Sequence, residues 1–164
     1  MKKSWIIWGV VIIGALWIYF SISGTYNNMV TKSETVDASW AQVQNVYQRR
    51  ADLIPNLVET VKGYAEHEQE TFTMVTEARA KATSMNINAA GLNEQNLQQF
   101  QAAQDQLSSA LSRLMVVVEK YPDLKANQNF LDLQAQLEGT ENRITVERRA
   151  FNTAAQDYNT YIKK

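Results

Sequence analysis

The chain has 164 residues, with two prolines, six glycines, one histidine and no cysteine. The lack of cysteine excludes a disulfide framework, a thiolate zinc site, an iron–sulfur cluster and a cysteine nucleophile. Few glycines and prolines argue against an all-β fold, which needs many turns. The 16 basic and 17 acidic residues nearly balance, and no concentrated basic face is apparent, so we expect no nucleic-acid partner.

Residues 5–22 (WIIWGVVIIGALWIYFSI) form an uncharged segment of eighteen residues. At 1.5 Å per residue this helix is roughly 27 Å long, close to the ~30 Å hydrocarbon core of a bilayer. Aromatic residues stand near both ends, as the two headgroup interfaces favour. A cleaved signal peptide is the alternative, since 21–23 (SIS) is a passable cleavage site. The apolar core is longer than signal peptides need, so we expect a retained membrane anchor in residues 1–24.

The charges beside this segment predict its orientation. Lys2 and Lys3 precede it, whereas Lys32 on the other side is followed by Glu34 and Asp37. The positive-inside rule then places the N-terminus in the cytoplasm and the rest of the chain outside.

Apolar residues recur with heptad spacing from 26 to 82, which predicts one helix of about 57 residues. Pro55 lies inside it, and because the heptad phase is unchanged across Pro55 we expect a kinked continuous helix. The alternative is a break at Pro55, with the helix folding back on itself. Residues 83–93 (TSMNINAAGLN) predict a loop.

Two further helices are predicted at about 94–120 and 123–162, separated by Pro122. Each carries one apolar stripe, as in an antiparallel bundle. The expected fold is therefore all-α: an N-terminal transmembrane helix, then a bundle of three long helices with coiled-coil-like packing in residues 25–164.

The apolar stripe of the first long helix is narrow near the membrane, where its flanks are polar. The shorter second helix is too short to cover it, so this part lacks an obvious partner within the chain. Exposed apolar stripes usually mark interfaces, which predicts self-association of copies side by side on the membrane. The candidate oligomer seam consists of Met29, Val36, Trp40, Val43 and Tyr47.

Two charged residues occupy seam positions, Arg50 and Glu68. Either Arg50 extends its charged end to water while Glu68 lies at the edge of the bundle, or the two residues fix its register by pairing with polar seam residues, such as Gln104 or Glu147. Within the second alternative, Arg50 with Glu147 is the pair to test, because one charge of each sign would otherwise be partly buried. The side-chain amide of Asn56 is expected to satisfy the carbonyl that Pro55 leaves without its helical donor.

The chain lacks the usual sets of catalytic groups. His67 has no second histidine four residues away, as a zincin motif needs, and no Glu-x-x-His pair for a di-iron bundle exists. A metal site assembled from His67 of several copies stays an alternative to a solvated histidine. No phosphate loop or nucleophile elbow appears, so we expect no enzyme, no catalytic residue, no metal and no cofactor.

Several stretches together resemble the LemA family along essentially the whole chain. They are YNNMV at 26–30, RRADLIPNLVETVKGYAEHE at 49–68, YPDLKA at 121–126 and FLDLQAQLEGTENRI at 130–144, followed by RRAF and DYN. The motif residues singled out are Arg49, Arg50, Asp52, Pro55, Asn56, Tyr64, His67 and Glu68. Family members usually continue past the last YN into a stretch with Phe-Pro, so the end at Lys164 is either truncated or different.

The resemblance implies a bacterial single-pass protein of the cytoplasmic membrane with a long-helix bundle and no known catalytic activity. Some members are linked to magnetosome membranes, and others to gene neighbourhoods with membrane proteases. We therefore expect a non-enzymatic, membrane-anchored scaffold that self-associates and organises other envelope components. The alternative is a monomeric extracytoplasmic adaptor or sensor that recruits a membrane protease or another envelope protein. The expected partners are the lipid bilayer, further copies of the chain, and membrane or envelope proteins.

Overall fold

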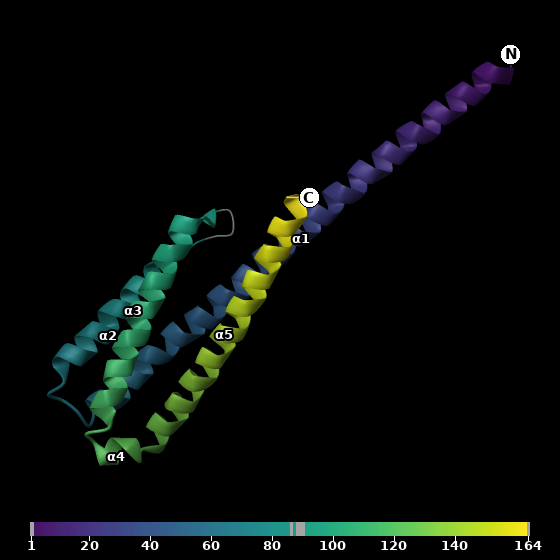
Figure 1. Ribbon diagram of the computed structural model, residues 1–164. Helices are drawn as coiled ribbons and strands as arrows, with labels where there is room; N and C mark the ends of the chain where they lie inside the picture. The colour runs from purple at the N-terminus through teal and green to yellow at the C-terminus, as the bar shows by residue number, and fades with distance from the viewer. Residues whose placement is uncertain (1, 86, 88–90, 164) are drawn as a thin grey trace. The chain divides into compact units, whose positions relative to one another are not determined.

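A computed structural model describes residues 2–85, 87 and 91–163 (Figure 1). These residues form five helices and no strand. The helices are α1 (Lys2–Lys62), α2 (Gln69–Ser84), α3 (Glu94–Val118), α4 (Pro122–Lys125) and α5 (Gln128–Ile162). The predicted all-α fold with a long apolar N-terminal helix is confirmed.

The chain forms two compact units, to both of which α1 and α5 contribute. The first unit is Met1–Ser39 with Ala150–Lys164, and the second is Trp40–Arg149. The anchor at 1–24 and the bundle at 25–164 stay a prediction from hydropathy.

In the first unit, α1 contains one segment long and apolar enough to cross a membrane. Its most apolar window of 18 residues has a mean hydropathy of 1.6, and none of that window is buried in the protein. Large side chains such as Trp8, Ile13 and Trp17 are 64%, 68% and 73% exposed. This surface has no apolar cover within the described part of the chain.

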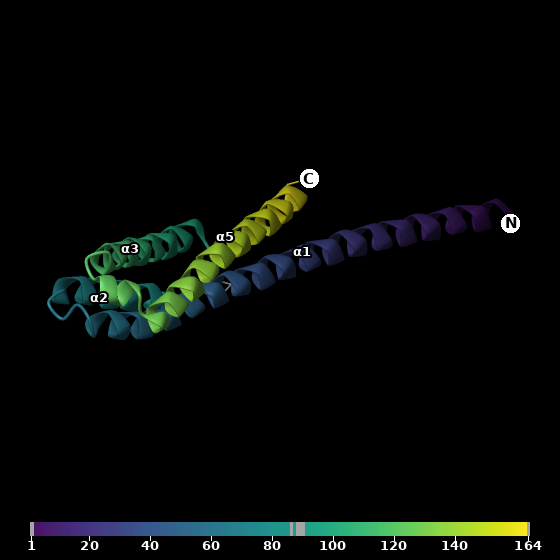
Figure 2. The ribbon, with the colours of Figure 1, turned by 90° about the horizontal axis from the view of Figure 1, so that it is seen from below.

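The predicted continuous helix over 26–82 is wrong in its second half. α1 ends at Lys62, residues 63–68 form a turn, and α2 begins at Gln69. Gly63 favours this end because glycine costs about 1 kcal/mol relative to alanine inside a helix. The Ala65 side chain within the turn is 1% exposed, so the turn itself contributes to the core. α2 returns along α1 and packs against α3 (Figures 1 and 2).

Pro55 lies inside α1 without ending it, so the alternative of a break at Pro55 is also wrong. Because proline has no N–H, the carbonyl of Ala51 four residues earlier lacks its helical donor. Arg79 on α2 supplies one: its Nε donates to Ala51 O at 2.7 Å. The expected role of Asn56 is therefore not found, since Asn56 is exposed and a residue from the neighbouring helix satisfies the carbonyl.

The predicted helix over 94–120 corresponds to α3, which Asn93 caps by accepting a hydrogen bond from Asn96 N at 2.8 Å. The predicted helix over 123–162 is interrupted, because α4 ends at Lys125 and α5 starts at Gln128. Asn127 explains the restart: its side-chain oxygen accepts from Phe130 N at 3.0 Å, as an N-cap does.

The core of the second unit joins α1, α2, α3, α4 and α5. Apolar side chains at helical spacing on the longer helices meet there with Leu124 of α4, and the most deeply buried are aliphatic. Its fully buried large members are Ile54, Leu57, Val61, Val75, Leu107, Leu114, Leu124 and Phe130.

Candidate functional site

The candidate oligomer seam is largely covered by the chain itself. Trp40, Val43 and Tyr47 are 2%, 2% and 6% exposed, so the expectation of a bare stripe is wrong for these three residues. Met29 and Val36, in the first unit, are half-buried. Self-association stays a prediction, but the part of the seam in the second unit is used within the chain.

An aromatic cluster accounts for this burial. The ring of Phe100 on α3 meets the rings of Trp40 and Tyr47 edge-on, with centroids 5.3 Å and 5.2 Å apart. Trp40 Nε1 donates to Ile87 O at 2.7 Å, and Gln44 Nε2 donates to the same oxygen at 2.9 Å. Ile87, which follows α2, therefore lies against this face of α1.

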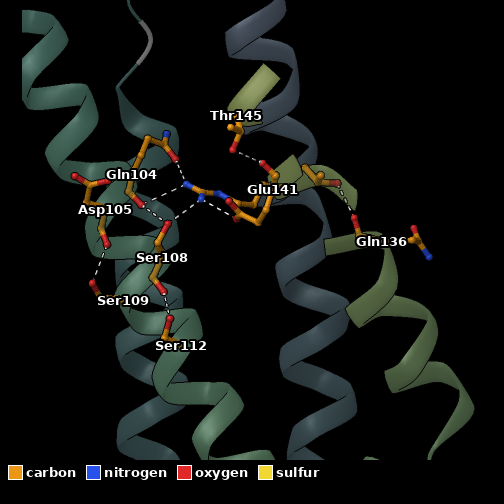
Figure 3. A network of polar contacts seen from close by, with 10 residues as sticks. Gln104, Asp105, Ser108, Ser109, Ser112, Gln136, Glu141 and Thr145 are labelled. Atoms are coloured by element: carbon orange, nitrogen blue, oxygen red, sulfur yellow. Dashed lines mark hydrogen bonds and ion pairs between the residues drawn. The ribbon is translucent and has the colours of Figure 1, made fainter. Parts of the chain in front are cut away.

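A buried arginine lies one turn further along α1. Arg50 is 1% exposed, and its guanidinium contacts side chains from α3 and α5. Figure 3 shows three of the partner side chains: Gln104, Ser108 and Glu141. Nη1 donates to Ser108 Oγ and to Glu141 Oε1, both at 2.9 Å. Nη2 donates to the side-chain and backbone oxygens of Gln104. We refer to Arg50, Gln104, Ser108 and Glu141 as the Arg50 network.

The Arg50 network decides between the alternatives left by the sequence. Arg50 pairs with Gln104, as considered, but the proposed pair with Glu147 is wrong because Glu141 is the carboxylate that it meets. Glu141 is 43% exposed, so one side of the ion pair reaches water. Tyr47 adds a cation–π contact, with Arg50 Cζ 5.0 Å from the ring centroid. Among the described residues, Arg50 Nε is the buried side-chain polar atom without a partner.

The other motif residues lie on the surface or in the turn between α1 and α2. Arg49 and Asp52 are exposed on α1, and His67 is exposed in the turn. Tyr64 Oη accepts a hydrogen bond from Asn127 Nδ2 at 2.9 Å, which ties the turn to the start of α5. Glu68 pairs with Lys120 Nζ at 3.6 Å. The contacts of Tyr64 and Glu68 therefore join the turn to the start of α5 and to the residues just after α3.

A cavity of about 260 Å³ adjoins the aromatic cluster. Its wall combines amide side chains, two aromatic rings and small or aliphatic side chains. The described ranges contain no group of three or more histidine, aspartate or glutamate side chains that could hold a metal ion. The lining residues are Gln44, Asn45, Tyr47, Gln48, Ala51, Ala82, Thr83, Met85, Phe100 and Gln104.

Burial raises the pKa of the Tyr47 phenol above its ordinary value near 10, although Arg148 and Arg50 oppose this effect. A raised pKa in the folded state contributes stability that is complete below the unfolded pKa and is lost as pH rises through the folded pKa. We therefore expect the free energy of unfolding to fall above about pH 10. In Tyr47→Phe this fall is expected to be smaller, as measured by urea midpoints between neutral and alkaline pH. An identical fall in both proteins would contradict the assignment.

Ser108, Glu141 and Arg79 were not singled out from the sequence. Gln104 and Ser108 are four residues apart on one face of α3, a spacing that signals a shared polar site. The sequence shows that Pro55 leaves the Ala51 carbonyl without its helical donor. It does not show which helix supplies a donor in its place.

A profile of the LemA family matches residues 39–164. Protein LemA of Metamycoplasma hominis is 24% identical over 98% of this chain and 69% of its own length. Magnetosome proteins MamQ 2 of Paramagnetospirillum magneticum and MamQ of Magnetospirillum gryphiswaldense are 28% and 27% identical over 85% of this chain. The chain spans 57% of the length of these magnetosome relatives. None of these names is that of an enzyme. The chain belongs to the LemA family.

Proposed function

We propose that the chain is a non-enzymatic scaffold anchored in the bacterial cytoplasmic membrane, which organises other envelope components. The observation that carries this proposal is the continuity of α1. One helix contains the exposed apolar segment and continues without a break to Lys62. The apolar side chains of its last turns form part of the core. The helix therefore joins the apolar segment to the core with no loop between them.

The proposed orientation has the N-terminus in the cytoplasm and the helical bundle outside. Lys2 and Lys3 before the apolar segment support it through the positive-inside rule. The test is digestion of intact cells with an external protease: the part of the chain after residue 24 is expected to be cleaved. Protection of this part would overturn the orientation.

We propose a non-enzymatic role because the cationic side chains of Arg50 and Arg79 bond to other helices of the chain. The Arg50 guanidinium binds Gln104, Ser108 and Glu141 rather than facing an open site. Arg79 binds a backbone carbonyl. These groups join helices to one another.

Self-association is part of the scaffold proposal, with Met29 and Val36 as the seam residues that the chain does not fully bury. The second candidate is a monomeric extracytoplasmic adaptor or sensor that recruits another envelope protein. The burial of Trp40, Val43 and Tyr47 favours this candidate, because those side chains are not available to another copy.

Cysteine crosslinking in membranes distinguishes the two candidates, and the chain has no native cysteine to interfere. The scaffold predicts disulfide-linked dimers of Val36→Cys and much less product from Glu34→Cys, an exposed control two residues away. It also predicts large discrete particles in mild detergent. Monomers in both measurements would reject self-association and favour the adaptor.

A further inference from the structure

The last turn of α5 lies beside α1 just after the apolar segment, and both belong to the first unit. Tyr161 Oη donates to Thr25 O at 3.2 Å. Lys32 Nζ lies 5.7 Å from the centroid of the Tyr161 ring. Figures 1 and 2 show the end of α5 running antiparallel to α1, so its last residues point towards the apolar segment.

The depth of this contact follows from helix geometry. Thr25 is three residues after Ile22, where the apolar segment ends, which is about 4.5 Å along the helix axis. Each polar layer of a bilayer is about 5–7.5 Å thick, from a ~30 Å core within a total of ~40–45 Å. If residues 5–22 span the core, the Tyr161 hydroxyl lies within the headgroup layer.

The side chains at this end of α5 suit that layer. Tyrosine is enriched at membrane interfaces because its ring is apolar and its hydroxyl is polar. Ile162 is 48% exposed although it is aliphatic, and Lys163 is exposed beside it. A lysine here can bury its stem among lipid and keep its ammonium group at the phosphates.

The order of charges along α1 agrees with this placement. Lys32, over the Tyr161 ring, is the charged residue of this stretch closest to the apolar segment. Glu34 and Asp37 follow it and lie about 3 Å and 8 Å further from the bilayer at the standard helical rise. On α5, Asp157 lies four residues before Tyr161 and so further from the bilayer than Lys163. Positive charge is therefore placed closest to the lipid phosphates.

We propose that Tyr161, Ile162 and Lys163 form a second membrane contact, which inserts into the headgroup layer next to the span and binds anionic lipid. This proposal rests on the proposed function, since it needs α1 to cross the bilayer. It implies that both the start of α1 and the end of α5 are fixed at the membrane.

The test uses nitroxide labels on single cysteines in the full chain, reconstituted in vesicles of phosphatidylcholine and phosphatidylglycerol. The reporter is Ile162→Cys, and the matched control is Asn152→Cys, which is exposed on the same helix ten residues earlier. Collisions with a water-soluble nickel chelate and with oxygen report the depth of each label. The label at 162 is expected to be several-fold less accessible to the nickel chelate than the label at 152.

A third label, at Val11→Cys, separates this proposal from the proposed function. Equal nickel accessibility at 162 and 152, with the label at 11 shielded in lipid, would overturn the second contact alone. A label at 11 that is open to water would instead overturn the membrane span.

The lipid charge is tested by adding Lys163→Gln to the reporter variant. This change is expected to raise nickel accessibility at 162 in vesicles that contain phosphatidylglycerol, and to have little effect in pure phosphatidylcholine. An equal effect in both lipids would contradict binding of anionic headgroups.

Discussion

Replacement of Arg50 by alanine is expected to lower the free energy of unfolding by about 3 kcal/mol or more, the low end of the range for breaking a buried ion pair. Arg50 is 1% exposed and bonds to residues on two other helices. The variant leaves the oxygens of Gln104, which is 4% exposed, without this donor. The Arg50 stem also packs in the core, so alanine loses apolar contact as well.

The low end of the range applies because Glu141 is 43% exposed and can turn to water once its partner is removed. Most of the loss in free energy of unfolding then comes from the buried Gln104 side chain, which loses its donor, and from the lost packing of the Arg50 stem. The measurement is urea unfolding followed by circular dichroism, on the full chain in mild detergent.

Arg49→Ala is the matched control, since Arg49 is the exposed neighbour on the same helix. We expect a change within about 0.5 kcal/mol there, as for ordinary surface substitutions. Glu141→Gln is expected to cost about 1–2 kcal/mol by weakening a hydrogen bond between charged groups, whereas Glu147→Gln is expected to cost little. A larger loss of stability from Glu147→Gln than from Glu141→Gln would contradict this assignment and support the pair of Arg50 with Glu147 instead.

The difference between Glu141 and Glu147 shows what heptad patterns leave undetermined. The apolar positions of a helix indicate which face is buried, but not how far the helix slides along its neighbour. The break at residues 126–127 separates α4 from α5, and it could not be read from the spacing of apolar residues alone. The buried side of α5 was therefore predictable, and the partner of Arg50 was not.

The turn at 63–68 was missed for a related reason. Val61, Glu68 and Val75 keep the seven-residue spacing through the turn, so the heptad pattern continues where the helix does not. Gly63 was the local signal, but a single glycine inside a helical pattern is often tolerated. At Pro55, by contrast, the unchanged heptad phase does correspond to a continuous helix, since α1 runs through this residue.

The expected bare seam followed from this error. With one helix over 26–82, only the second and third helices were available to cover the stripe. Because α2 folds back instead, Ile87 lies beside Trp40, and its carbonyl oxygen accepts the indole hydrogen bond at 2.7 Å. The long apolar helix at the N-terminus was predictable, because eighteen uncharged residues form a signal that does not depend on tertiary contacts.

Replacement of Arg79 by methionine is expected to destabilise the protein by about 2 kcal/mol. The reason is that Arg79 replaces the backbone donor that Pro55 lacks. Ala51 is 2% exposed, and its carbonyl accepts from Arg79 Nε at 2.7 Å. Without that donor a buried carbonyl is left unsatisfied, which typically costs about 1–3 kcal/mol. Methionine keeps an unbranched apolar stem, so the change removes mainly the hydrogen bond.

The same substitution made in Pro55→Ala should cost much less. Alanine at position 55 has the N–H that proline lacks, and in a continuous α1 this N–H donates to Ala51 O four residues earlier. A coupling free energy of about 1–2 kcal/mol between the two sites is therefore expected in a double-mutant cycle. Lys81→Met, exposed on the same helix, serves as the control and should change stability little in either background. Equal costs of Arg79→Met in both backgrounds would mean that Arg79 stabilises the fold in some way other than by replacing the donor that Pro55 removes.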